Sequence, residues 1–196
     1  TIGDVCLWLD EAGYQVEVAP TLDEATDLLC RKHFHSAVID ISLKPNDPRN
    51  SDGYKLMQWI GKQVWLEGVL PCVVLTSHDR GDLAIEGLVE KLPFTHWVRK
   101  LPNYSQTLLR NLSEIFRRSI RINFALAYDS DGEDRLPRIS QHIEWPEGEL
   151  RPDESILIEE IRDLFGKHFR GAARIYFEEL TQGLSGAAVV KVRAKW

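Results

Sequence analysis

The chain has 196 residues, of which 43% are hydrophobic and 28% charged, and its formal net charge is −6. This composition is typical of a globular protein, and the negative charge argues against binding of the whole chain to nucleic acid. No apolar run is long enough to span a membrane, no secretory signal opens the chain, and the three scattered cysteines are interpreted as reduced. We therefore expect a cytoplasmic protein that does not act at a membrane. Because the first segment is already helical in pattern, we expect a piece of a longer protein.

Helix-type and strand-type patterns alternate through residue 117. The expected strands cover 14–18, 37–41, 72–75 and 96–99. The expected helices cover 1–12, 21–32, 53–62, 79–91 and 104–117. Gly13 ends the first helix, and Thr21 with Glu24 forms a capping box for the second. This alternation predicts a parallel sheet with helices on both faces, and such sheets bind ligands beyond the carboxyl ends of their strands.

The remainder of the chain has a different pattern. In order, we expect a strand within 122–128, an acidic turn at 129–134, a proline-containing loop at 137–153, a helix at 154–169, and strands at 173–180 and 187–192. The predicted division is an α/β domain over 1–118, a linker region over 119–153, and a small α+β extension over 154–196 that ends in a β-hairpin.

Three residues at strand ends carry the types of side chain that phosphoryl transfer needs. Asp40 interrupts an apolar strand, Thr76 ends the next strand, and Lys100 follows the last one. A carboxylate is the nucleophile, while a hydroxyl and a fixed cation bind the phosphoryl oxygens. We expect the three to converge at one edge of the sheet. A purely structural Asp40 is the alternative.

Four segments, in the right order, resemble the receiver domain of bacterial response regulators. They are Leu9–Val16, Ala37–Leu43 with Asp52-Gly53 after it, Val73–Ser77 and Trp97–Lys100. The resemblance implies a flavodoxin-like fold in a two-component phosphorelay, with Asp40 phosphorylated by a sensor histidine kinase. It also implies that Thr76 and Trp97 switch together and that Lys100 pairs with the phosphate. Mg²⁺ would be held by Asp40 and the backbone carbonyl of Ser42.

The family's first strand, and the acidic pair that follows it and holds Mg²⁺, are absent from this sequence. We therefore expect weak Mg²⁺ binding and weak labelling by acetyl phosphate. In the family that strand lies between the strands at 14–18 and 37–41, so we expect the gap to be closed. The candidates are residues 187–192, a strand from a second copy of the chain, or direct pairing of the two flanking strands. A hairpin that packs elsewhere as an independent unit is the alternative.

The turn Gly183-Leu184-Ser185-Gly186 resembles the glycine-rich loop of aminoglycoside-phosphotransferase-like kinases. This implies phosphate binding by Gly183, Ser185 and Gly186 at the start of a kinase-like output domain. An ordinary hairpin turn is the alternative. We do not expect this chain alone to be an enzyme. Two other functions stay open: a degenerate receiver that only binds partners or dimerises, and the N-terminal part of an ATP-dependent phosphotransferase.

Two further clusters favour structural roles. Cys30, His33 and His35 lack a second ligand pair at the spacing of a zinc site. Asp129–Gly132 resembles part of a calcium loop but lacks its later glutamate. We expect Cys30 to be an inward-facing helix residue and Asp129–Gly132 to form a solvated turn.

Overall fold

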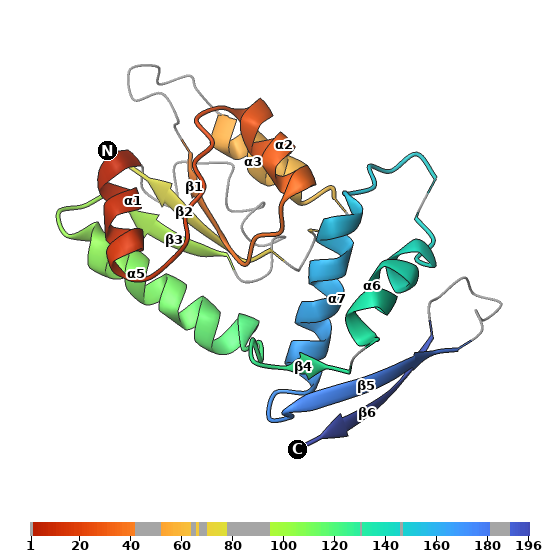
Figure 1. The fold of residues 1–196 in the computed structure, drawn as a ribbon. Coiled ribbons are helices and arrows are strands. Elements are labelled where there is room, and N and C mark those ends of the chain that lie inside the picture. Colours follow the sequence, from red (N-terminus) through yellow and green to blue (C-terminus); the bar gives the residue numbers. More distant parts are fainter. Residues whose placement is uncertain are drawn as a thin grey trace. The chain divides into compact units, whose positions relative to one another are not determined.

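The structure is a computed structural model that describes residues 2–41, 52–63, 66, 70–77, 95–129, 131–145, 147–180 and 189–196. The chain divides into two compact units. The first comprises Thr1–Leu29 and Phe34–Ser119, and the second comprises Cys30–His33 and Ile120–Trp196. Each unit contains one three-stranded sheet with helices, so the fold is mixed α/β (Figure 1). None of the described helices is long and apolar enough to cross a membrane.

The sheet of the first unit is parallel, with the order β1-β2-β3. Its strands are β1 (Ala37–Asp40), β2 (Cys72–Thr76) and β3 (His96–Arg99). The central strand β2 is buried at every position, as its uninterrupted apolar run predicts for a strand covered on both faces. Since all three strands run in the same direction, their carboxyl ends meet at one edge of the sheet.

Helices lie on both sides of this sheet. On one side are α1 (Ile2–Glu11) and α5 (Tyr104–Ile115), and on the other are α2 (Leu22–Arg31) and α3 (Asp52–Ile60) (Figure 1). The apolar stripe of α3 buries Leu56, Met57 and Ile60, and that of α5 buries Leu108, Leu112 and Ile115. After α5, the π-helix η2 (Phe116–Ile120) leads into the second unit.

The strand predicted at residues 14–18 is wrong. This segment joins no ladder, and Val16 and Val18 are 38% and 48% exposed. A strand is stabilised by hydrogen bonds to a neighbour, and β1 pairs only with β2 in the part of the sheet that the structure describes. Neither predicted closure within the chain occurs among the described residues: 14–18 does not pair with β1, and β6 (Val190–Lys195) pairs with β5 (Arg174–Glu179). The helix predicted at 79–91 lies outside the described residues.

The second unit is built on the strand order β4-β5-β6. The short β4 (Ala127–Tyr128) runs parallel to β5, and β6 runs antiparallel to it. Helices α6 (Gly132–Gln141) and α7 (Glu154–His168) complete the unit. The core consists of Leu136, Ile139, Ile161, Phe165, Ile175 and Phe177.

The loop predicted at 137–153 is wrong over its first residues, because α6 continues to Gln141 with Pro137 inside it. A proline inside a helix costs about 3 kcal/mol. Burial of Leu136 and Ile139 on either side of it offsets that cost, and the Ser140 hydroxyl donates to the Pro137 carbonyl at 2.7 Å. Packing thus overrides a local breaker signal. The strand expected within 122–128 is also shorter than predicted, since β4 covers two residues.

Candidate functional site

Asp40 and Lys100 form an ion pair at the carboxyl edge of the first sheet. Lys100 Nζ donates to Asp40 Oδ2, and the two side chains are 29% and 21% exposed, in the order Lys100 and Asp40. Both strand ends extend the ladder: the Lys100 N–H donates to the Thr76 carbonyl at 2.7 Å, and the Ile41 N–H donates to the Leu75 carbonyl at 3.0 Å. The pair is therefore held on a rigid backbone while it stays open to solvent.

Thr76 lies at the same edge, as the last residue of the central strand. It is 1% exposed, and its register partner is Arg99, directly before Lys100. Asp40, Thr76 and Lys100 thus come together from three neighbouring strands. A carboxylate, a hydroxyl-bearing residue and an ammonium group at one sheet edge are the elements that could accept and retain a phosphoryl group.

A glycine positions the first of these residues. Gly53 is the second residue of α3, and a Cβ at this position would lie 2.0 Å from the carbonyl oxygen of Asp40. No real Cβ contact is that short, and the clashing atom is backbone that cannot rotate away. Only glycine lets the first turn of α3 approach the end of β1, so Gly53 fixes where Asp40 lies.

Tyr104 and Asp4, which the sequence patterns did not single out, are linked electrostatically in this region. Tyr104 is the first residue of α5, and its ring packs edge-on against Trp8 at a centroid distance of 5.4 Å. Burial raises the pKa of Tyr104, and the negative charges of Asp4 and Asp40 raise it further. Asp4, on α1, is a second carboxylate whose charge acts on Tyr104. No sequence motif links Asp4 to Asp40, so the sequence alone could not identify Asp4.

The structure says less about the other predicted site residues. Trp97 is half-buried in β3, with Val74 as its register partner. Ser42, the predicted carbonyl ligand of Mg²⁺, and Gly183, Ser185 and Gly186 of the predicted phosphate-binding turn lie outside the described residues.

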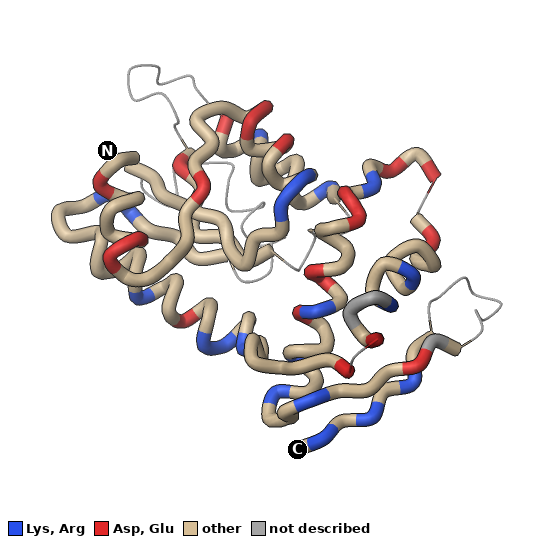
Figure 2. The backbone as a smooth tube through the Cα atoms, viewed as in Figure 1, with Lys and Arg blue, Asp and Glu red and all other residues tan. Residues whose placement is uncertain are grey.

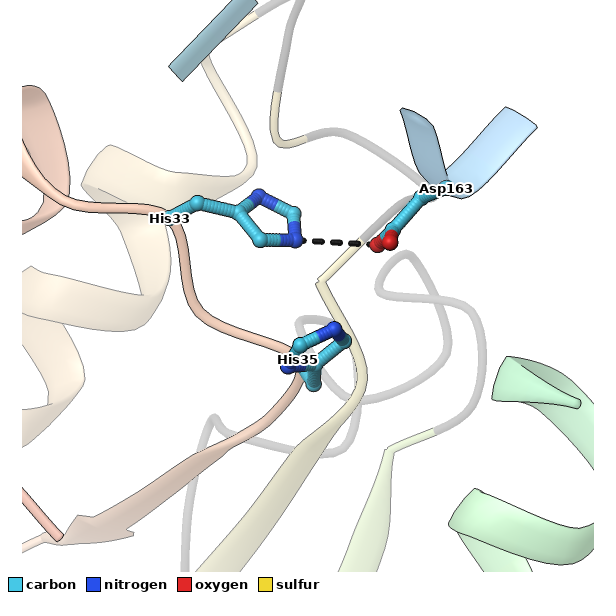
Figure 3. Close-up of side chains that lie close together, drawn as sticks. All are labelled: His33, His35 and Asp163. Atoms are coloured by element: carbon cyan, nitrogen blue, oxygen red, sulfur yellow. Dashed lines mark hydrogen bonds and ion pairs between the residues drawn. The ribbon is translucent and has the colours of Figure 1, made fainter. Parts of the chain in front are cut away.

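A second ionic cluster lies within the second unit. His33 Nε2 lies 2.9 Å from Asp163 Oδ2, and His33 Nδ1 lies 3.2 Å from Glu160 Oε1. Figure 3 shows His33 and Asp163 facing each other; the third residue drawn, His35, belongs to the first unit. Burial by itself lowers the pKa of His33, but its hydrogen bonds to Asp163 and Glu160, and their charges, raise it to about 9.

This cluster has residue types that bind metals, yet its geometry is that of an ion pair. Imidazole and carboxylate are common ligands of divalent ions. With a pKa of about 9, however, His33 is protonated at neutral pH, and each ring nitrogen donates a proton to a carboxylate. A ring that is protonated on both nitrogens has no lone pair for a metal. The cluster therefore ties residues 30–33 to α7.

Comparison of the chain with protein-family models, with curated proteins and with solved structures found no match.

Proposed function

We propose that the first unit is a phosphoacceptor module of the receiver type, in which Asp40 accepts a phosphoryl group from a partner histidine kinase. The observation that carries the proposal is the ion pair between Lys100 and Asp40 at the carboxyl edge of a parallel sheet, with Thr76 at the end of the strand between them. The strand order β1-β2-β3, with helices on both sides, supports a flavodoxin-like arrangement.

The chemistry follows from the side chains. A carboxylate oxygen of Asp40 attacks phosphorus, the new O–P bond forms as the P–N bond of the donor phosphohistidine breaks, and the released imidazole takes up a proton. The ammonium of Lys100, already beside Asp40, then pairs with a phosphoryl oxygen. The Thr76 hydroxyl is the proposed donor to another. The added negative charge at this edge is the signal passed to the rest of the protein.

Mg²⁺ would be held by Asp40, the one predicted metal ligand whose side chain the structure describes. Mg²⁺ is commonly bound through one or two carboxylates, with water and phosphate oxygens as its other ligands, so the single carboxylate of Asp40 fits it minimally. The bound cation would offset phosphate charge. Lys100 supplies the same kind of charge compensation from the protein, so we expect slow but measurable labelling by a small phosphodonor.

The test is labelling of the full chain with acetyl phosphate and Mg²⁺, followed by intact-mass analysis. We expect weak labelling that Asp40→Asn abolishes. Asp52→Asn is the matched control, because Asp52 lies next to Gly53 and pairs with Lys55 at 3.3 Å. Labelling of Asp40→Asn equal to that of the wild type would refute the proposal.

A second candidate function, a dimerisation module, is favoured by one observation. In the described part of the sheet, β1 has a hydrogen-bonded neighbour on one side only. The N–H groups of Ala37 and Ile41 point toward the β2 side, so by alternation that of Val38 points to the other edge. An open edge can pair with a strand of a second copy. Light scattering would show a dimer that Val38→Pro dissociates, whereas a monomer at all concentrations would exclude this function.

A further inference from the structure

The outer face of the β5–β6 hairpin is strongly basic. Side chains alternate along both strands, and the inward ones, such as Ile175 and Phe177, belong to the core of the second unit. The outward positions form three directly opposed pairs: Arg174 with Lys195, Tyr176 with Arg193, and Glu178 with Lys191. Four cations, one aromatic ring and one carboxylate therefore share this face. Figure 2 shows the cationic residues gathered along the two strands.

The charges on this face are poorly compensated. Glu178 lies 3.9 Å from Lys191, a loose ion pair between exposed side chains. Within the part of the chain that the structure describes, Arg174, Arg193 and Lys195 form no ion pair. Arg174 and Lys195 even oppose each other directly across the ladder, an arrangement that destabilises a sheet. An anionic partner that neutralises both would remove this cost.

We propose that this face binds single-stranded nucleic acid, with Arg174, Arg193 and Lys195 contacting phosphates and Tyr176 stacking on a base. The Tyr176 side chain is 36% exposed and lies opposite Arg193, so an aromatic surface lies among the cations. Cations beside an exposed ring are the combination that single-strand binding surfaces use. Charge alone would attract this face to an anionic membrane, whereas a single strand also offers bases that stack on the ring. The net charge of −6 describes the whole chain, whereas this face carries a local excess of positive charge.

The proposal is tested by fluorescence anisotropy of a labelled oligothymidine of about 15 nucleotides, a length in the range of known single-strand sites. The full 196-residue chain is used. Arg193→Gln and Lys195→Gln are each expected to weaken binding at least threefold. Arg118→Gln is the matched control, because Arg118 is an exposed arginine outside the hairpin, and it should leave binding within a factor of two. The slope of log affinity against log salt should be about −0.7 per phosphate contacted.

Two further variants separate stacking and charge from misfolding. Tyr176→Phe should retain binding and Tyr176→Ala should lose at least fivefold, because only the ring is required. Glu178→Gln removes the single negative charge and should strengthen binding about twofold, a gain that a misfolded protein cannot give. Binding that is absent, that resists these substitutions, or that appears only with phosphatidylserine vesicles would overturn the proposal. None of these outcomes depends on Asp40.

Discussion

Lys100 Nζ donates to the carboxylate of Asp40 across two strand ends that are 60 residues apart in the chain. Both side chains are partly exposed, and an ion pair in that setting contributes only about 0–1 kcal/mol to stability. The pair therefore contributes little to the stability of the fold, and under the proposed function Lys100 pairs with the phosphoryl group.

This distinction yields the first prediction. Lys100→Gln should change the free energy of unfolding by less than about 1 kcal/mol, as measured by urea denaturation, because the pair is solvent-screened. The same variant should lose the response of the first unit to beryllofluoride, an analogue of a phosphoryl group, followed by changes in Trp97 fluorescence or amide NMR shifts. Lys55→Gln, which removes an ion pair of the same type with Asp52, should keep that response. If Lys100→Gln responds normally, Lys100 does not bind the phosphoryl group.

The second prediction concerns Gly53. Gly53→Ala places a Cβ 2.0 Å from the Asp40 carbonyl oxygen, so α3 or the end of β1 must shift. We expect a loss of about 3 kcal/mol in urea denaturation, near the upper end for overpacking, because the clash is with backbone. Gly148→Asn is the control: Gly148 has φ +83, a Cβ added there would meet nothing within 4 Å, and asparagine tolerates that backbone. Equal stability of the two variants would contradict the close approach.

The third prediction tests the start of α2. The Glu24 N–H donates to Thr21 Oγ1 at 3.2 Å, as the capping-box pattern predicts. Thr21→Ala should destabilise the first unit by about 1 kcal/mol, and Thr21→Ser, which keeps the oxygen, should cost much less. Thermal denaturation of the two variants compares them directly, and an Ala variant as stable as the Ser variant would show that the cap contributes nothing.

Local signals in the sequence anticipated the features that depend on neighbours along the chain. The cap at Thr21, the left-handed Gly13 at φ 85, and the buried strand β2 follow from residue type and spacing over a few positions. The meeting of Asp40 and Lys100 was also predictable, because parallel strands bring their carboxyl ends to one edge.

Features that depend on tertiary packing were not predictable in the same way. The helix continues through Pro137 because the residues beside it are buried. Residues 14–18 do not form a strand because, among the described residues, no strand pairs with them to supply hydrogen bonds. The contact between His33 and Asp163 joins residues 130 positions apart with no shared motif. Such a contact becomes visible only once α7 is placed.

The fourth prediction concerns this contact and its dependence on pH. The carboxylates of Asp163 and Glu160 outweigh the effect of burial and raise the pKa of His33 from 6.5 to about 9. A raised pKa means that the folded state holds the proton more tightly than the unfolded state. The stabilisation is therefore fully present below pH 6.5 and is lost as the pH rises through 9. After allowance for solvent screening, its size is on the order of 2 kcal/mol.

NMR titration of the imidazole ¹⁵N shifts should place the His33 midpoint near 9, and Asp163→Asn should lower it. In urea denaturation of the second unit, the wild type should lose stability between pH 7 and pH 10 by more than His33→Gln does, because glutamine does not titrate. His168→Gln is the matched control: His168 lies in the last turn of α7 and is exposed, so its removal should leave the pH profile unchanged. Parallel pH profiles for the wild type and His33→Gln would show that the imidazolium does not stabilise the fold. A His33 midpoint near 6.5 would show that the two carboxylates do not hold its proton.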